Sequence, residues 1–410
     1  MKLSLGPFKG MNNRAEDHAL PVNSEDSSTM VRNAVSVDFT NVGKIKMRNG
    51  STKKCSGFDM KYGFACLQGQ FVVEGTILKK VNADWTKTTI SSGILGDTFA
   101  YYEHNNELFF SDGLVGKKII NGTAQNWGMS NPTAPVVYSS SGIFGAGVYL
   151  CCLTFYDALG NESGASNITS ISVIENSSIV FTSLPSSSDN QVIGIRLYMT
   201  TANGKIFYQC GDAAIGTLSY QVTLPYDGGK VLETLFMTKP PAGQIIREHN
   251  SRLLIAKDNL LYVTEAYSTD LVSQLSNSYF QFSDDITVVE PVDDGVWLVA
   301  DKTYFFVGSG PENFQQLTKL DYGAALGTGQ KLSNKNVCWF STRGLIMAGN
   351  GGEIKNMQED QVVPDYSAKG AMLIREENGM KQAITSLNNP SMSAMAASSW
   401  ITAEQIRREV

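Results

Sequence analysis

Residues 281–357 constrain the fold more than any other stretch of this chain. Short β-rich runs alternate there with tight turns, and no amphipathic segment of helical length interrupts them. The run VWLVA leads into the turn residues Asp301-Lys302 and then YFFVG, and CWFST leads into Arg343-Gly344 and then LIMAG. Two β-rich runs joined by a short polar turn indicate a β-hairpin. Hairpins that recur about every 40 residues are typical of four-stranded propeller blades.

The same pattern precedes this stretch. Residues 60–127 hold two similar units, each with the order strand, polar turn, strand, second turn, strand and tryptophan, ending at Trp85 and Trp127. A single meander cannot bury its own faces, so we expect these units to stack on neighbours. The runs AVSVDF and KIKM within residues 31–50 predict a further hairpin, and the run GAMLIREENGMKQAITSL at 370–387 predicts another around Glu377-Asn378-Gly379.

A different module lies between the two blade regions. Pro132 and Pro135 form a stiff entry at residues 131–135, and strands then recur at the spacing of a β-sandwich of about 95 residues. The turn residues Gly160-Asn161-Glu162-Ser163 and the later run Ile195-Arg196-Leu197-Tyr198 resemble fibronectin-type modules. In such modules the first motif, which here includes Tyr156-Asp157, is a strand and its turn, and the second is a core strand.

The predicted fold class is therefore all-β, a β-propeller interrupted by an inserted β-sandwich of fibronectin/Ig-like type. The predicted segments are an N-terminal arm at 1–30, the first propeller blades at 31–130, the sandwich at 131–228, the remaining blades at 229–365, and a C-terminal hairpin and tail at 366–410. Two separate small β-domains are the alternative. We favour the single propeller because isolated meanders would leave exposed strand edges.

Charge and cysteine content narrow the function classes. The formal net charge of −6 argues against tight wrapping of nucleic acid, which requires clustered Lys and Arg, but not against a wall that DNA slides past. The sequence has no CxxC pair, so a zinc site is not expected. We expect reduced thiols rather than a disulfide framework, and opposite orientations for the adjacent Cys151 and Cys152. The six cysteines are Cys55, Cys66, Cys151, Cys152, Cys210 and Cys338.

Targeting signals are not evident in the sequence. The N-terminal run MKLSLGPFKGMNN lacks the apolar core of a signal peptide, and no run reaches the roughly 18 apolar residues of a membrane helix. We therefore expect a protein that is made in the cytoplasm and does not insert into a membrane. Such a protein can still become part of a particle that is released from the cell.

No candidate constellation predicts catalysis or ligand binding, so we predict no catalytic, cofactor or metal site. His18, His104 and His249 have no metal-binding spacing. The acidic pairs Asp284-Asp285 and Asp293-Asp294 are expected in solvated turns rather than as a glycosidase dyad. The remaining candidates are the turn Ser111-Asp112-Gly113, which lacks the spacing of sialidase repeats, and the glycines Gly323, Gly327 and Gly329, which lie among strands rather than in a phosphate loop.

The segment from PPAG at 240–243 through the hairpin NSRLLIAKDNLLYVTEA to CWFSTRGLIMAGNGG resembles the propeller portion of short-tailed bacteriophage tail nozzle (tail tubular protein B-like) proteins. The run Tyr304 to Gly308 followed by Gly310-Pro311, the segment Asn33 to Gly50 and the arm GMNNRAEDHALP carry the same likeness. The resemblance covers about 31–130 and 239–400, with the sandwich as an insertion.

This resemblance implies a virion structural protein rather than an enzyme. It implies a homohexameric ring at the distal tail that docks on a tail adaptor protein, anchors tail fibre or spike proteins, and encloses the DNA ejection channel without specific DNA binding. Assembly would take place in the host cytoplasm. The alternative is a carbohydrate-binding or receptor-binding propeller in which Trp127 or Trp297 stacks on sugars; core packing is the favoured role of both tryptophans.

Overall fold

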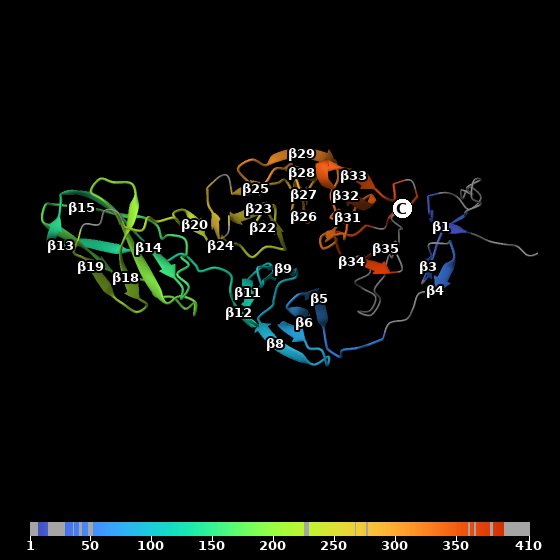
Figure 1. Cartoon of the computed structure of the whole chain (residues 1–410), viewed down its shortest axis with the longest axis horizontal. Coiled ribbons are helices and arrows are strands. Elements are labelled where there is room, and N and C mark those ends of the chain that lie inside the picture. The colour runs from blue at the N-terminus through green and yellow to red at the C-terminus, as the bar shows by residue number, and fades with distance from the viewer. Residues whose placement is uncertain are drawn as a thin grey trace, which may run out of the picture. The chain divides into compact units, whose positions relative to one another are not determined.

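The computed structural model describes residues 7–14, 29–35, 37–40, 43–47, 52–224, 229–266, 268–275, 278–359, 361–364, 366–377 and 380–388 (Figure 1). Within these ranges the regular structure is β-strand with a 3-10 turn and no α-helix, so no described helix could cross a membrane. The chain forms two compact units. Unit 1 comprises Met1–Gly57, Asp258–Leu260 and Gln281–Val410, and unit 2 comprises Phe58–Lys257 and Leu261–Phe280.

Unit 2 begins with two up-and-down antiparallel sheets of the propeller-blade type. The first contains β5 (Met60–Cys66), β6 (Gly69–Glu74), β7 (Ile77–Val81) and β8 (Lys87–Ser92). The second contains β9 (Ala100–His104), β10 (Glu107–Ser111), β11 (Gly116–Ile120) and β12 (Thr123–Asn126). Phe71 and Leu78 of the first sheet pack with Leu108 and Phe110 of the second in one core cluster, so each meander covers an apolar face of the other.

The two tryptophans that were expected to end equivalent units have different positions. Trp85 lies in a turn before β8, is 45% exposed, and has a φ of 67°. Trp127 follows β12 and is buried. The equivalence was wrong because β8, with the polar sequence KTTISS, is an additional strand beyond Trp85 that carries little apolar signal.

A third blade-type sheet in unit 2 follows the sandwich. Its strands are β21 (Ile245–His249), β22 (Arg252–Lys257), β23 (Leu260–Glu265) and β24 (Ser268–Ser273), extended by β20 (Met237–Thr238) and β25 (Tyr279–Gln281). Ile246, Leu253 and Ile255 of this sheet share a core cluster with Phe109 and Trp127 of the preceding blade. The predicted hairpin around Asp258 is confirmed by the pairing of β22 with β23.

The inserted module is a sandwich of two antiparallel sheets, at left in Figure 1. One sheet has the order β13-β16-β19 and the other β15-β14-β17-β18. Phe144, Leu153, Phe181 and Leu197 lie in the core between them. The strands are β13 (Val136–Phe144), β14 (Gly147–Tyr156), β15 (Thr169–Val173), β16 (Ser177–Thr182), β17 (Gly194–Thr200), β18 (Phe207–Ala214) and β19 (Ser219–Val222).

Unit 1 contains residues 281–357, for which the sequence predicts recurring hairpins. It forms two blade-type sheets, and both predicted hairpins are confirmed by the pairing of β27 with β28 and of β31 with β32. Trp297 and Trp339 pack together in the core between these blades. The strands are β26 (Val288–Val292), β27 (Gly295–Val299), β28 (Thr303–Val307) and β29 (Gln315–Leu320), then β30 (Gln330–Lys331), β31 (Val337–Ser341), β32 (Gly344–Ala348) and β33 (Ile354–Asn356).

Strands from both ends of the sequence belong to unit 1. The parallel pair β1 (Phe8–Met11) and β2 (Thr29–Val31) and the hairpin of β3 (Val37–Phe39) and β4 (Ile45–Met47) come from its N-terminal part. The C-terminal hairpin pairs β34 (Lys369–Glu377) with β35 (Met380–Asn388). An ion pair of 3.2 Å between Arg375 and Asp38 connects the two regions.

The predicted fold class is confirmed: the chain is all-β, with propeller-type meanders interrupted by an inserted sandwich. The strands of the sandwich lie within the predicted segment 131–228. Much of the predicted arm, at 1–6 and 15–28, and the predicted tail beyond residue 388 lie outside the described residues.

Candidate functional site

The tryptophans considered as sugar-stacking residues are core residues. Trp297 on β27 is fully buried, and its Nε1 donates a hydrogen bond of 2.9 Å to the carbonyl oxygen of Gly349. Trp127 is buried against Phe109, and its Nε1 donates a bond of 2.7 Å to the carbonyl oxygen of Thr269. Buried indoles whose N–H groups are already bonded contribute to packing. Neither ring presents a face to a ligand.

The described histidines lie at the ends of strands. His104 ends β9 and His249 ends β21, and the Nε2 atom of each lies about 3 Å from the Nδ2 atom of the asparagine that follows it. His18 falls outside the described residues. Among the residues that the structure describes, no group of three or more His, Cys, Asp or Glu side chains could hold a metal ion.

The acidic pair Asp293-Asp294 lies in the turn between β26 and β27 and connects two adjacent blades. The backbone N–H of Asp293 donates to Asn350 Oδ1 at 3.1 Å, and Asp294 Oδ2 accepts a bond of 2.6 Å from the N–H of Gly351. Lys335 donates to Asp293 at 2.9 Å and thereby lowers the pKa of that carboxyl. The prediction of a structural turn is confirmed for this pair.

Asp112 in the turn Ser111-Asp112-Gly113 is a buried carboxylate that organises its loop. Its two oxygens accept four backbone N–H groups at 2.8–3.1 Å, from Leu95, Gly96, Leu114 and Val115. Burial by itself raises the pKa of Asp112, but these four donors outweigh burial and lower it. The turn therefore holds an ionised structural aspartate, and Gly96 packs so closely on it that an added Cβ would overlap the Asp112 backbone.

The two predicted acidic residues Asp284 and Asp285 line a hollow of about 450 Å³ in unit 1. Asn259, Thr287 and Tyr366 share its wall. The lining contains no basic side chain that could balance the two carboxylates or bind an acidic ligand. Gly323 also lies in this wall rather than in a loop that leads into a helix, which agrees with the sequence interpretation of the glycines.

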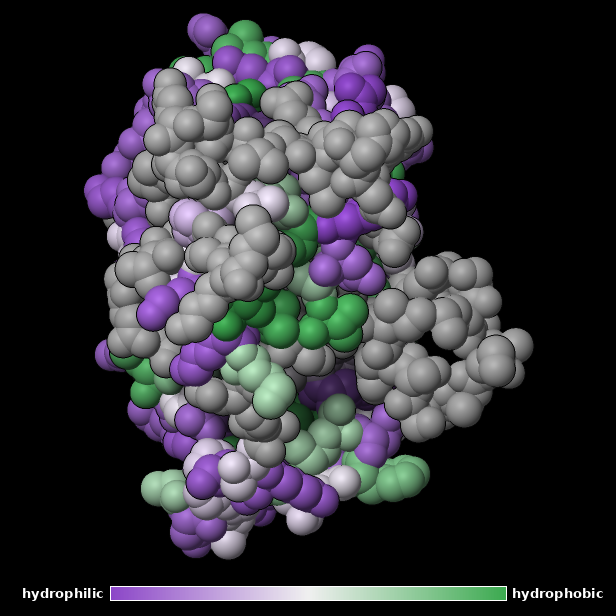
Figure 2. All heavy atoms as spheres, turned by 90° about the vertical axis from the view of Figure 1, so that its right-hand side faces the viewer, coloured by the Kyte–Doolittle hydropathy of each residue, from purple (hydrophilic) through white to green (hydrophobic). Residues whose placement is uncertain are grey.

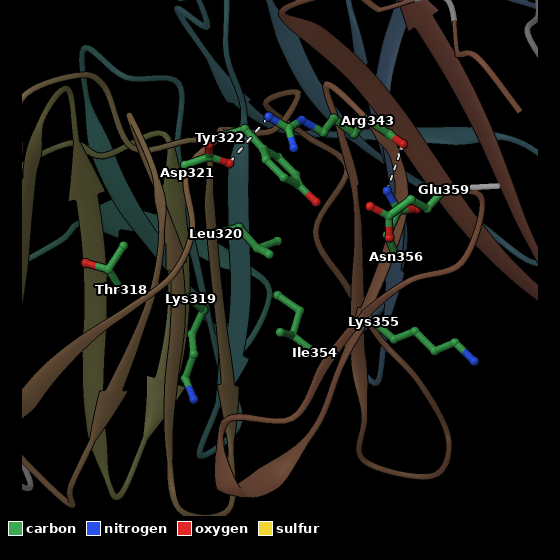
Figure 3. Close-up of a pocket in the computed structure, with 10 residues that line it drawn as sticks. All are labelled: Thr318, Lys319, Leu320, Asp321, Tyr322, Arg343, Ile354, Lys355, Asn356 and Glu359. Carbon is green, nitrogen blue, oxygen red and sulfur yellow. Dashed lines mark hydrogen bonds and ion pairs between the residues drawn. The ribbon is translucent and has the colours of Figure 1, made fainter.

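A larger hollow of about 640 Å³ lies between the outer strands β29 and β33 of adjacent blades in unit 1 (Figure 3). Leu320 and Ile354 form its apolar floor and pack against the core cluster of the two tryptophans. The Arg343 guanidinium lies 4.4 Å from the centre of the Tyr322 ring and 3.5 Å from Asp321, as Figure 3 shows. Lys319, Lys355 and Glu359 complete the lining, so the hollow carries both charge signs.

This inter-blade groove can bind but has no arrangement for catalysis. Arg343 and Asp321 are more than half exposed, so their ion pair contributes little to stability. An aromatic ring, an arginine and an apolar floor are residue types enriched at protein interfaces. The sequence did not indicate this groove, because its lining residues come from two adjacent blades within residues 318–359 and no local spacing shows which of them face one hollow.

The strongest polar cluster joins the two sandwich motifs that the sequence singled out. Glu162 has a side chain only 6% exposed and accepts hydrogen bonds from Thr154 at 2.8 Å, Tyr198 at 2.8 Å and Arg196 at 2.5 Å, with Lys230 as a further donor. Burial raises the pKa of Glu162, but these donors outweigh it and lower the pKa. The Arg196 guanidinium also stacks 4.7 Å from the Tyr156 ring centre.

The Glu162 cluster fixes the turn after β14 against β17, so its role is structural. All of its hydrogen-bonding capacity is used, which leaves no acceptor for a substrate. The adjacent cysteines behave as expected, since Cys151 lies in the core between the sheets and Cys152 in a separate cluster with Tyr198 and Phe207. Burial raises the pKa of the Cys151 thiol to about 12.

Comparisons with known proteins give likenesses of fold only. No protein-family model and no curated protein matches the chain. A catalytically inactive virginiamycin B lyase from Staphylococcus aureus is 12% identical, with 79% of this chain and 90% of that chain covered and a TM-score of 0.32. BBS1N in complex with ARL6DN is 12% identical, with 79% and 88% covered and a TM-score of 0.31. The AfRom2 CNH domain is 8% identical, with 86% and 94% covered and a TM-score of 0.27.

Proposed function

We propose that this chain is a non-enzymatic structural component of a bacteriophage tail. In this proposal it forms a nozzle ring at the distal tail, encloses the DNA ejection channel, and anchors fibres or spikes. The sequence resemblance of the blade hairpins to tail nozzle proteins suggests the assignment. The main supporting observation is that the side chains considered for chemistry already have structural contacts. Asp112, Asp293 and Glu162 accept hydrogen bonds within turns or between strands, and both candidate tryptophans are buried in cores.

Exposed apolar residues on the terminal elements of unit 1 support a role in assembly. Figure 2 looks onto the side of the molecule that carries β1, β3 and β4 in Figure 1, and apolar residues are visible there among polar ones. Exposed apolar residues grouped on neighbouring elements are typical of protein–protein contact surfaces. Among the exposed apolar residues of unit 1, Val35 and Met47 belong to its N-terminal part and Val363 and Leu373 to its C-terminal part, and all four are more than half exposed.

The proposed partners are further copies of the chain in a hexameric ring, a tail adaptor protein and fibre or spike proteins. The acidic balance of −6 suits a channel wall. Like charges repel DNA within about one Debye length, roughly 8–10 Å, so the wall would not retain the DNA that passes it. Virions would contain the protein in their tails after assembly in the host cytoplasm.

Native mass spectrometry and negative-stain microscopy of the purified protein test this proposal. We expect a closed ring of several copies, and we expect the double variant Met47→Asp, Leu373→Asp to lose it. Leu159→Asp is a control, because Leu159 is even more exposed than the two test residues but lies on a sandwich turn. A protein that stays monomeric at all concentrations and is missing from purified virions would refute the assignment.

A further inference from the structure

Lys118 on β11 is held between two carboxylates that come from different blades of unit 2. Its side chain is 6% exposed, and it is the one lysine among the described residues that is buried. Its Nζ lies 2.7 Å and 3.0 Å from the two carboxylate oxygens of Asp270 on β24. The same nitrogen lies 3.5 Å from Oε2 of Glu107 on β10. A buried amine therefore contacts one carboxyl group closely and has a second acid beside it.

The strands hold these side chains at an apolar contact between the two blades. Phe109 pairs with Lys118 across β10 and β11, and the centre of its ring is 5.9 Å from Nζ. Phe109 belongs to the buried cluster shared by the two blades. Asp270 lies within a register shift between β23 and β24, an irregularity of the kind that re-aims a side chain. The bond from Trp127 Nε1 to the carbonyl oxygen of Thr269 fixes the residue before it.

Burial disfavours charge at this contact. It raises the pKa of Glu107, and the negative charge of Asp270 adds to the rise against the lowering effect of Lys118. Two buried ions both carry a desolvation cost, which a neutral amine beside a neutral carboxylic acid avoids. The neutral forms are also the reactive ones, since an amine needs its lone pair to attack a carboxyl carbon.

We propose that Lys118 and Asp270 join in an intramolecular isopeptide bond, with Glu107 as the proton carrier. A proton first passes from the Lys118 ammonium to the Asp270 carboxylate. The Nζ lone pair then attacks Cγ of Asp270, and a C–N bond forms. Glu107 takes one proton from the attacking nitrogen and gives it to the Asp270 hydroxyl, whose C–O bond breaks as water leaves. One amide and one water replace the amine and the acid, and Glu107 ends as the carboxylate that it was.

The position of the two groups in one folded chain favours this condensation. Well-oriented intramolecular reactions reach effective molarities of about 10⁵–10⁸ M, which offsets the competition from water. The product is neutral, so the two buried charges disappear together with their desolvation cost. The bond joins β11 to β24 across the whole sandwich insertion. The two blades then stay linked even where the sandwich between them unfolds.

Other lysine–carboxylate contacts of the chain differ from this one and provide a control. Lys335 and Asp293 are both more than half exposed. Lys79 and Lys87 share the single carboxylate of Glu74 in the first blade. In neither place does a buried amine contact two carboxylates, so neither should form an amide.

Intact-mass spectrometry of the denatured full chain tests the bond. We expect the wild type to be lighter than its sequence by one water. Tandem spectrometry of a digest should find a peptide with Lys118 linked to a peptide with Asp270. Lys118→Arg retains the positive charge but stays protonated, and Glu107→Gln retains a polar group that cannot carry the proton, so both should have the full mass. Glu74→Gln is the matched control, because Glu74 is also paired with lysine, and it should lose one water as the wild type does.

Hydrogen exchange of the β10 and β11 amides verifies that the variants are folded, and the mass of the wild type tests the bond even if a variant is not. A folded wild type that keeps the full mass of its sequence after several days overturns the proposal. Loss of water that maps to a single peptide without a link, or that persists in Lys118→Arg, overturns it as well. An equally fast link in Glu107→Gln overturns the role of Glu107.

Discussion

Replacing Glu162 tests whether the polar cluster holds the sandwich together. Removing one partner of a buried ion pair typically costs about 3–5 kcal/mol. Lys230 is 48% exposed and can be rehydrated, whereas Arg196 is only 17% exposed. We therefore expect Glu162→Ala to lower the free energy of unfolding of the sandwich by about 3 kcal/mol, at the lower end of that range.

Glu162→Gln separates charge from hydrogen bonding. Its amide oxygen still accepts from Arg196, and its NH₂ group donates to the hydroxyls of Thr154 and Tyr198, which can turn to accept. The charge-assisted part of the bonds is lost, so we expect a loss of about 1–2 kcal/mol. Glu175→Gln is the control at an exposed turn of the same sandwich and should change stability by less than about 0.5 kcal/mol.

Hydrogen exchange of the amides in β14 and β17 measures the stability of the sandwich. Tryptophan fluorescence does not report on the sandwich, since no tryptophan lies within residues 131–228. Glu162→Ala should speed exchange in β14 and β17 by about two orders of magnitude, because 1.4 kcal/mol is a factor of ten. Unchanged exchange, or an equal effect of Glu175→Gln, would refute a structural role of the cluster.

The pH dependence of the sandwich's stability tests the role of Glu162 independently. The pKa of Glu162 is lower in the folded protein than its usual value of 4.5, so the unfolded chain binds its proton more readily. The stability from Glu162 is fully present above pH 4.5 and is lost as pH falls through the folded pKa. In Glu162→Gln this part of the acid sensitivity should disappear.

Three further predictions concern the blades. Lys79 and Lys87 donate to Glu74 at 2.7 Å each and lower its pKa to about 2, so a carbon-detected NMR titration should find this carboxyl still ionised at pH 3. The stability that Glu74 contributes should be lost as the pH falls from about 4.5 to about 2, and Glu74→Gln should lack this loss. Trp297→Ala should cost about 3–5 kcal/mol by urea unfolding, whereas Trp85→Ala should change stability by less than about 1 kcal/mol because that indole is half exposed. Asp112→Asn replaces one oxygen of a carboxylate that accepts four N–H groups with a donor, so calorimetry should show a loss of about 2 kcal/mol.

The strands could be predicted where local signals are strong. β27 and β28 are continuous apolar runs on either side of a short turn that contains Asp301 and Lys302, and both properties are visible within about a dozen residues. β8 and β12 could not be recognised in this way because they are short outer strands with polar sequences. An outer strand buries one weakly apolar face, so its position depends on the strand that it pairs with.

The candidate sites could be predicted only as single residues. The sequence indicated that Glu162 and Arg196 belong to two motifs of one module, but their contact depends on the pairing of β14 with β17. Lys118 and Asp270 form an ion pair of 2.7 Å between two blades that are separated in sequence by the whole sandwich. No local spacing predicts such a pair, because the insertion separates the two blades in the sequence without changing how they pack on each other.

The direction of the carboxylate pKa shifts bears on the class of function. A general acid needs a raised pKa and space for a substrate, as in buried catalytic carboxylates. Asp112, Glu162 and Asp293 have lowered pKa values, because they accept hydrogen bonds from backbone N–H groups or cations on neighbouring strands. Each is therefore an ionised carboxylate that stabilises a turn or the contact between two strands. These three carboxylates therefore lack the raised pKa that a general acid needs.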